Sequence, residues 1–456
     1  MTGDDETSAV PGIGGRAAAG AGDERERVPG NESGRPSWSA MLAAFGVTDF
    51  TWYWCGQLLS GIGTWSQSIA LAWLVLDLTH SAVDLGTITM LQFLPVLALA
   101  LFGGVIADRL PRRQLLVATQ VALTAEALAL GVLVATHAVT LWEVGLISFA
   151  VGTTNALNNP TQQAFVPELV GRDLVADAVA LNSVQFNTAR MAGGAVGGLA
   201  IAAWGISGAL FLNAASFAPI LLVLIKIRPA HASGRPVAGR ATAMSELRQG
   251  LSFALATTPI RRVVVLFAVV GLLGFNWQVA VPLVARFVLH RQAAGFGDLM
   301  AALGAGSLVA AVAVARDQRA SEHRLVVGGV ALGAALVALG LSRSYPLSLG
   351  VLAFAGIAGV VTSITANTRL QLLTPNHLRG RVMGIYVLLM GGTTPVGSFL
   401  LGEVAGHLGT GAALVVFGAA TAGGVGLVAT LRRRASSRTG GAEAPEGSQG
   451  TTIGAC

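Results

Sequence analysis

The chain has 456 residues, of which 53% are hydrophobic and only 11% charged, and its mean hydropathy is +0.66. An ordinary soluble domain is far less apolar, so most of this chain is expected to lie in lipid. The net charge of +6 does not indicate a nucleic-acid partner, because the arginines stand in short loops between apolar runs, where they set membrane orientation. Lys226 is the single lysine, a composition typical of a GC-rich genome such as that of an actinobacterium.

Cysteine usage and the first residues carry little further information. Cys55 lies in an apolar run and Cys456 is the last residue, so neither suggests a disulfide framework or a metal site. The beginning of the chain lacks the apolar core of a secretory signal and is rich in Gly, Glu and Arg, which predicts a disordered tail.

Apolar runs of about 20 residues, the length that crosses a bilayer, predict twelve transmembrane helices. The first six are expected at 54–78, 85–107, 115–135, 141–156, 179–204 and 208–227. The second six are expected at 263–289, 297–315, 325–341, 347–366, 382–401 and 411–431. The predicted organisation is a disordered cytoplasmic N-terminal tail (1–45), an N-terminal six-helix half (46–228), a cytoplasmic linker (229–258), a C-terminal six-helix half (259–431) and a cytoplasmic C-terminal tail (432–456).

Basic residues indicate which loops are cytoplasmic, because those loops carry an excess of Lys and Arg. If the N-terminus lies inside, the external loops hold Arg286, Arg291 and Arg343, and Arg190 lies within a span. The other basic residues fall in the inner loops and tails. The pattern predicts a multi-pass protein of the cell membrane with both termini cytoplasmic.

The two halves repeat one another weakly. The segments PELVGR at 167–172 and PNHLRGR at 375–381 each follow the fourth span of their half, and Asn155 and Asn367 precede them at similar distances. Paired halves are typical of transporters built from repeats. We therefore predict an all-α integral membrane fold of two pseudo-symmetric six-helix halves.

The most specific motif directly follows the second span. It reads GVIADRLPRR at 104–113 and resembles the signature of the major facilitator superfamily, with Pro111 where that family usually has Gly. Gly104 would allow close helix approach, and Asp108 offers a carboxylate to the positive end of a neighbouring helix. A basic loop that only sets topology would explain the arginines but not Asp108. In the family this loop braces the halves on the cytoplasmic side, which implies a conformational gate of Gly104, Asp108, Arg109, Arg112 and Arg113.

Other segments are similar to the branch of that superfamily that contains enterobactin exporters and macrolide efflux pumps. The resemblance covers nearly all of residues 50–431 and implies proton antiport. GGAVGG at 193–198 departs from the Gly-Pro that antiporters often have there, but its glycines still offer small faces for helix packing: Gly193, Gly194, Gly197 and Gly198. The similar segments are QLLSGIGTWSQ (57–67), AWLVLDLT (72–79), NPTQQ (159–163), ALNS (180–183) and FLNAASF (211–217).

Polar side chains within the spans mark a candidate cavity. Gln57, Ser60, Thr64 and Gln67 follow spacings of three and four and so share one face of the first helix. We interpret that face as cavity lining, with close helix packing through small and amide side chains as the alternative.

Arg190 lies in the middle of a span, with Ser183 and Asn187 at matching helical spacing. An arginine there costs at least about 2.5 kcal/mol unless a cavity or partner compensates, so it is predicted to face the interior. It could bind an anionic substrate, pair with a carboxylate or tie helices together through backbone carbonyls. The sequence leaves these three roles open.

Two other groups complete the candidate site. Glu126 is the carboxylate nearest the middle of a span and is the candidate for proton coupling; a structural hydrogen bond is the alternative, because the third helix of each half is often peripheral in the family. The remaining cavity candidates lie in the seventh and eleventh spans, where core packing is the alternative, above all for the methionines: Asn276, Gln278 and Tyr386, with Met383 and Met390.

These features predict a secondary active transporter that exports a small hydrophobic or amphipathic molecule, such as a drug, an antibiotic or a siderophore, by alternating access. It would use the proton gradient and no cofactor or metal, and its partners would be the lipid bilayer and the substrate, with no nucleic acid and a monomeric state. The chain has no Gly-Lys P-loop, which argues against an ATP-driven pump. A transport-inactive sensor, or a membrane enzyme of unknown chemistry, is the alternative.

Overall fold

The computed structural model describes residues 42–227, 243–316, 320–375 and 377–439. For residues 100–109, 172, 243–247, 315–316 and 431–439 it describes the backbone and not the side chains. Within these ranges the regular elements are all helices and no strand occurs. The expected tail at 1–45 and the first part of the expected linker fall largely outside the described residues.

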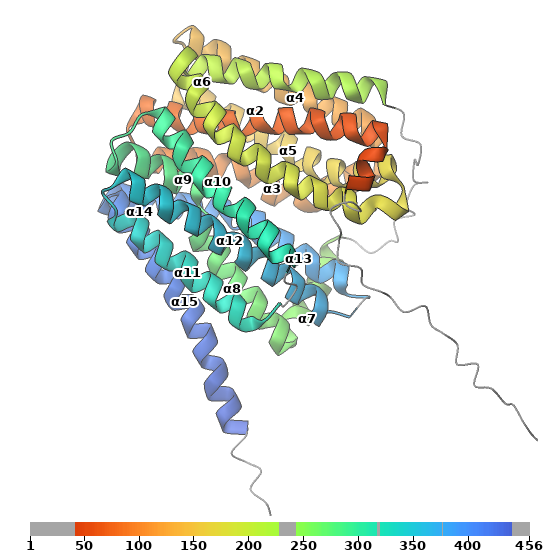
Figure 1. Cartoon of the computed structure of the whole chain (residues 1–456), viewed down its shortest axis with the longest axis vertical. Coiled ribbons are helices and arrows are strands. Elements are labelled where there is room, and N and C mark those ends of the chain that lie inside the picture. Colours follow the sequence, from red (N-terminus) through yellow and green to blue (C-terminus); the bar gives the residue numbers. More distant parts are fainter. Residues whose placement is uncertain (1–41, 228–242, 317–319, 376, 440–456) are drawn as a thin grey trace, which may run out of the picture. The chain divides into compact units, whose positions relative to one another are not determined.

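The N-terminal half, α2 to α6, contains five long helices. The last of them, α6, is two spans joined at Gly205, whose φ of 72° and ψ of −178° reverse the chain. A residue with a side chain rarely adopts this φ, so glycine is required where the ribbon doubles back (Figure 1). The bounds are η1 Leu42–Gly46, α2 Thr48–Thr79, α3 Ala82–Arg109, α4 Arg112–Ala135, α5 Leu141–Val170, η2 Arg172–Leu174 and α6 Val175–Lys226.

The C-terminal half, α8 to α15, has two interrupted spans. The seventh span breaks at Phe275 and Asn276 and ends in a π-helical turn, and the eleventh breaks at Thr393. A short helix, α7, precedes this half. The bounds are α7 Ala243–Ala256, α8 Thr258–Gly274, α9 Trp277–Leu283, η3 Val284–Val288, α10 Ala293–Arg316, α11 Glu322–Leu341, α12 Tyr345–Leu373, α13 Arg379–Gly392, α14 Thr394–Leu408 and α15 Thr410–Thr439.

These helices give the twelve predicted crossings. Ten helical segments of the described chain are long and apolar enough to span a bilayer, and α6 is one of them although its two limbs each cross. The remaining crossing is α5, whose hydropathy is lowered by polar residues such as Asn155 and Asn158. The all-α fold predicted from the sequence is confirmed.

The structure extends several predicted boundaries. The fourth span, expected at 141–156, continues as helix to Val170, because its second half is polar but still hydrogen-bonded along the helix. The expected linker contains α7, which contacts α8 and α13. The last helix runs to Thr439, into the segment expected to be a tail.

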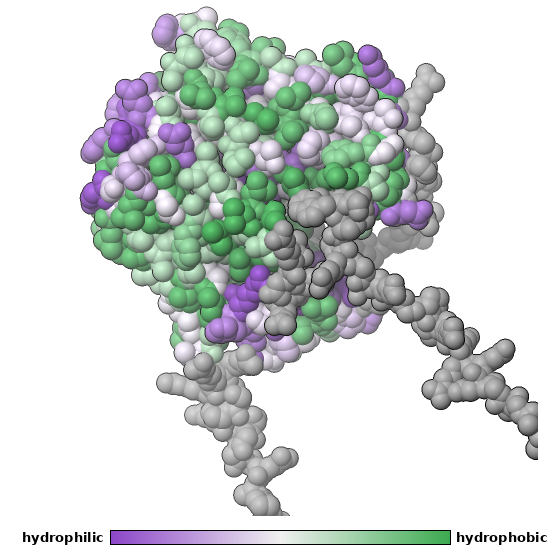
Figure 2. Space-filling model, in the orientation of Figure 1, coloured by the Kyte–Doolittle hydropathy of each residue, from purple (hydrophilic) through white to green (hydrophobic). Residues whose placement is uncertain are grey.

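The outer surface of the helices is apolar. Large hydrophobic side chains are exposed along α4 and α6, among them Val121, Val132, Leu199 and Leu222. Figure 2 shows apolar side chains over most of this face, with hydrophilic residues gathered toward the margins. An exposed apolar surface of this extent requires lipid around it.

We call the end of the helices that carries α7 the linker end, and the opposite end, at the α2–α3 turn, the far end. The halves contact one another through α3 with α14 and through α6 with α10. Small residues allow these approaches. A Cβ on Gly86 of α3 would lie 2.8 Å from the Ser398 carbonyl oxygen of α14, and one on Gly402 would lie 2.7 Å from the Ala82 carbonyl oxygen.

Candidate transport site

Four glycines of α6 allow two other helices to pack closely against it. Gly193 and Gly197 lie against α2, where added Cβ atoms would stand 2.5 Å from the Trp65 Cβ and 2.9 Å from the Ser66 Cα. Gly194 and Gly198 lie against α10, 3.2 Å from the Met300 Cβ and 3.0 Å from the Ala293 carbonyl oxygen. The helix α6 is therefore wedged between a helix of its own half and a helix of the other.

The side chain of Arg190 points toward the space between α2 and α10. One turn before the glycines, Ala189 abuts Gly61 of α2 and Met191 abuts Gly304 of α10. At about 3.6 residues per turn, the side chain of Arg190 projects between these two contacts. Leu199, nine positions further on, is on the opposite side of the helix and is 66% exposed, as expected of a lipid-facing residue.

The guanidinium of Arg190 has no counter-charge among the described residues. Its Nε is buried without a hydrogen-bond partner. Of its two predicted companions, Asn187 donates its Nδ2 to the Ser183 carbonyl oxygen at 2.9 Å, and Ser183 is exposed. The residues on this face thus become more accessible toward the linker end.

The polar stripe of α2 divides into buried and exposed members. Gln57 is buried and donates Nε2 to the Tyr53 hydroxyl at 3.0 Å. Gln67 is buried and accepts from Asn213 Nδ2 of α6 at 2.6 Å. Ser60 is buried as well, whereas Thr64 is exposed. Thr64 is therefore the member most accessible to a ligand, and cavity lining by the stripe stays a prediction.

The break in the seventh span is fixed by Asn276. Its Nδ2 donates to the Leu272 carbonyl oxygen at 2.7 Å, and its Oδ1 accepts from the Ser398 hydroxyl at 3.4 Å. A Cβ on Gly397 of α14 would lie 2.6 Å from that Oδ1. Asn276 is 2% exposed and joins the break to α14, whereas the neighbouring Gln278 is half-buried.

Tyr386 lies beside the linker-end part of α8. Its ring stacks on Phe267, with centroids 4.9 Å apart, and its hydroxyl donates to the Ser363 carbonyl oxygen at 3.3 Å. Met383 is half-buried, and Met390 is 44% exposed with its sulfur 3.8 Å from the Tyr386 hydroxyl.

Glu126 is bound to the neighbouring helix of its own half. Its Oε1 accepts from the Thr154 hydroxyl of α5 at 2.8 Å, and its Oε2 is buried without a partner. Nearer the linker end, Thr119 and Asn158 make a similar bond at 3.0 Å between the same helices. The α4 helix packs mainly on α5 and α6, so the carboxyl lies away from the main contacts between the halves.

The signature loop is only partly visible in the structure. The backbone of Gly104, Asp108 and Arg109 ends α3, but the side chains of Asp108 and Arg109 are not described. Arg112 pairs with Glu168 of α5 at 2.7 Å and donates to the Ala164 carbonyl oxygen. Arg113 donates to the Leu224 and Ile225 carbonyl oxygens at the end of α6. Both arginines thus fasten the loop to α5 and α6 at the linker end.

The second half carries a corresponding pair of opposite polarity. Glu322 at the start of α11 lies 3.7 Å from Arg369 near the end of α12. The helices α11 and α12 correspond to α4 and α5 in the repeat, so the acid and base have exchanged helices. Neither pair could be predicted from sequence spacing, because the two residues of each pair lie far apart in the chain.

Arg286 bridges the two halves at the far end and was expected only as a loop residue. It lies in η3, with Nη2 3.6 Å from the Asp77 Oδ1 and 3.3 Å from the His80 Nε2 of the α2 terminus. Its guanidinium lies 5.1 Å from the ring centroid of Trp73, which stacks on Phe296. We call Arg286, Asp77, His80 and Trp73 the far-end latch. The one feature of the sequence that could have pointed to this contact is an arginine at the end of a long apolar run.

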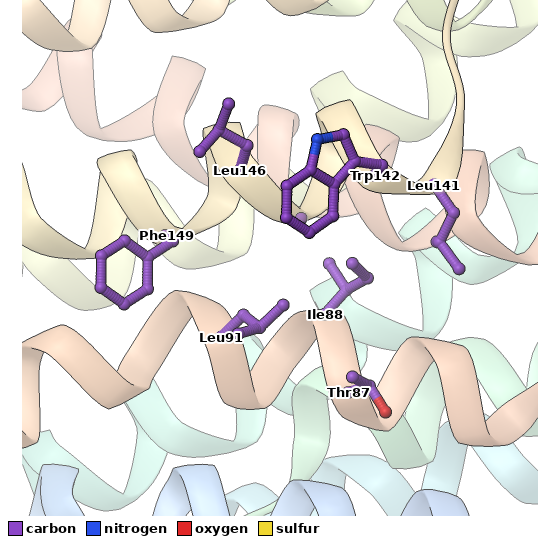
Figure 3. Close-up of a pocket in the computed structure, with 8 residues that line it drawn as sticks. Thr87, Ile88, Leu91, Leu141, Trp142, Leu146 and Phe149 are labelled. Carbon is purple, nitrogen blue, oxygen red and sulfur yellow. The ribbon is translucent and has the colours of Figure 1, made fainter.

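The cavities on the surface of the described helices include an apolar one and a more polar one. The first, of about 450 Å³, is an apolar groove between α3 and α5, with Trp142 and Phe149 opposite Leu91 (Figure 3). The second, of about 860 Å³, lies at the far end where the halves meet and is lined by polar groups including His80, His290 and Arg343. No group of three or more His, Cys, Asp or Glu suited to a metal ion is found in the described part of the chain.

The fold matches that of solved membrane transporters. The structure of the nucleoside transporter NupG superposes with a TM-score of 0.69 at 10% identity, covering 84% of this chain and 99% of that one. At this identity the likeness shows the fold alone. Twelve apolar helices in two halves therefore define an all-α multi-pass membrane protein with the fold of these transporters.

Within that class the sequence identifies the family. Residues 39–444 match the family described as transmembrane secretion effector, and the chain belongs to that family. It is 26% identical over 362 residues to the multidrug efflux pump Tap of Mycolicibacterium fortuitum, covering 77% of this chain and 88% of that one. It is also 26% identical over 364 residues to the enterobactin exporter EntS of Shigella boydii, covering 77% and 82%.

Proposed function

We propose that this protein is a secondary active exporter of a small hydrophobic or amphipathic molecule, of the drug, antibiotic or siderophore kind. The relatives it matches are named for multidrug efflux and for export of a siderophore. It would work by alternating access, with the halves rocking about a site near the membrane midplane. The chain would act as a monomer.

The arrangement of contacts between the halves carries this proposal. The two halves are joined by the far-end latch. They are also joined by close contacts at glycines, between Gly86 and Gly402 and between Met191 and Gly304. Toward the linker end, Ser183 and Phe186 of α6 and Val387 of α13 are exposed. Such an arrangement is expected of a transporter that is closed at one end and open at the other.

We propose that the linker end is cytoplasmic, which would make this an inward-open state with both termini inside. The basic residues support this orientation. Arg112, Arg113, Arg261, Arg262 and Arg369 all lie at the linker end, and cytoplasmic loops carry the excess of Lys and Arg. The gate loop at 104–113 would then close the linker end in the outward-open state.

We propose proton antiport as the energy source, with no cofactor and Glu126 as the coupling site. Its unpartnered Oε2 can take up a proton, while Oε1 is held by Thr154. Because Thr154 belongs to α5, protonation would act by changing how α4 packs on α5, and not by direct contact with the other half.

The decisive experiment uses the purified full chain in proteoliposomes with an imposed proton gradient. A fluorescent hydrophobic compound should accumulate against its concentration gradient when the gradient is present and stop when a protonophore is added. Transport that ignores the proton gradient would remove antiport. No transport of any compound in a panel of drugs and siderophores would favour a transport-inactive sensor instead.

A further inference from the structure

We propose that Arg190 is the anchor of an anion-binding site between α2, α6 and α10, and that the transported molecule carries a negatively charged group on an aromatic or aliphatic body. The inference rests on the proposed export function and adds the substrate class. It selects one of the three roles that the sequence left open for this arginine.

Arg190 has no partner within the described part of the protein. Among the described residues, Arg190 forms no ion pair with a carboxylate, and its buried Nε has no acceptor. A guanidinium that served to tie helices together would donate to backbone carbonyls, as Arg113 does at Leu224. Arg190 makes no such bond to any described residue, so neither structural role is filled among them.

Arg190 lies beside a contact between the two halves. It projects between the α2 contact at Ala189 and the α10 contact at Met191, which is nearer the linker end than the contacts at Gly194 and Gly198. Below it on the same face are the half-buried Asn187 and the exposed Ser183. A charge at this position can reach a ligand that enters between the halves from the linker end.

An unpaired cation at this depth carries a free-energy cost. A charge within the bilayer is expensive unless compensated, and such residues persist mainly where function requires them. A ligand that supplies the missing anion would remove the penalty and gain a charge-assisted hydrogen bond. The natural ligand groups are a carboxylate, a catecholate or the enolate of a 1,3-dicarbonyl, because guanidinium donors match planar oxygen pairs.

The surroundings suit the apolar part of such a ligand. Phe186, one turn before Arg190, is 55% exposed. Its ring meets Trp65 of α2 edge to face, with centroids 5.7 Å apart. Thr64, which directly precedes Trp65 in α2, is exposed as well. The site thus combines one cation, an accessible aromatic ring and small hydroxyls, which favours amphipathic anions over neutral or cationic drugs.

Binding of matched probes to the full chain in nanodiscs tests the proposal. The probes are pyrenebutyrate and its methyl ester, which share a ring system and differ in charge, and binding is measured as the difference between discs with and without protein. We expect the wild type to prefer the carboxylate by about tenfold or more, the size of one charge-assisted hydrogen bond in a site of low polarity. Arg190→Gln should lose this preference and Arg190→Lys should keep most of it.

A matched control and a stability measurement separate a binding role from a structural one. Arg261→Gln changes the net charge equally at an exposed position of the linker end and should keep the preference. Removing an unpaired buried cation should leave the thermal midpoint unchanged or raise it, so Arg190→Gln should be at least as stable as the wild type. A structural arginine would instead lower the midpoint by several degrees.

The proposal is overturned if the wild type binds the ester as well as the carboxylate, if it binds neither, or if Arg190→Gln retains the preference or melts well below the wild type. Failure of the export function gives a different result. In that case the carboxylate preference and its loss in Arg190→Gln would both be seen, while proteoliposomes would show no concentrative transport of either probe.

Discussion

Arg286 and Asp77 form an ion pair across the interface between the two halves, with Nη2 3.6 Å from Oδ1 and with side chains that are 27% and 58% exposed. The pair sits where η3 meets the end of α2, and the guanidinium also covers the Trp73 ring. A π-helical turn often marks a functional site, and here it carries Arg286. If the halves rock apart at the far end, these contacts must break.

We therefore expect Arg286→Gln to shift the protein away from the far-end-closed state. A partly exposed ion pair and a cation–π contact together contribute about 1 kcal/mol, which corresponds to about a fivefold change in the ratio of states. Double electron–electron resonance between spin labels at the far end measures that ratio. Asp77→Asn should shift the ratio of states less than Arg286→Gln does. When Asp77→Asn is already present, adding Arg286→Gln should change the ratio less than it does in the wild type, because the two residues interact.

A disulfide between positions 83 and 406 should lock the far end closed. A Cβ on Gly406 would lie 2.6 Å from a methyl group of Val83, which brings two cysteines within bonding reach. The variant Val83→Cys with Gly406→Cys, built in a chain without Cys55 and Cys456, should lose transport when oxidised and recover it with reductant. Unchanged transport after complete cross-linking would show that the far end does not open.

Glu126→Gln should flatten the pH dependence of efflux while preserving insertion, because the amide cannot exchange a proton. The measurement is initial efflux rate against pH in proteoliposomes. Thr154→Val is the matched control: it removes the hydrogen bond to Oε1 but leaves a titrating carboxyl, so the pH profile should shift and not disappear. A wild-type profile in Glu126→Gln would eliminate this residue as the proton carrier.

Asp108→Asn should cripple transport and leave membrane insertion intact, because the proposed gate needs the carboxylate and the membrane orientation needs only the arginines. Efflux assays and a protease-protection map of the loops would measure the two properties separately. Efflux at the wild-type level would show that the loop only sets topology.

Gly193→Ala should destabilise the protein by about 1–3 kcal/mol, the usual cost of overpacking, because its Cβ would stand 2.5 Å from the Trp65 Cβ and 2.7 Å from the Ile62 carbonyl oxygen. Gly391→Ala is the control, since nothing lies within 4 Å of its Cβ, and alanine there should be neutral or stabilising. Thermal unfolding followed by size-exclusion chromatography compares the two. Equal midpoints would contradict the close packing of α6 on α2.

The sequence was sufficient for the membrane class and for the number of crossings, because burial in lipid imposes a length and an apolar composition on every span. It was also sufficient to identify the signature loop and to single out Arg190 as a charge inside a span. It gave poor boundaries where a helix is polar, as in the second half of α5, or where a helix is interrupted, as at Asn276 and Thr393.

Only the tertiary structure decided which polar side chains face one another. The stripe of α2 looks uniform in sequence, yet Gln67 is held by Asn213 in the second limb of α6 while Thr64 is exposed. The far-end latch joins Asp77 to Arg286, more than two hundred residues apart, and Arg190 is distinguished by having no partner among the described residues. Periodicity fixes the face of a single helix on which a residue lies, but the direction of that face depends on how the helices pack, and here glycine contacts between distant segments set the packing.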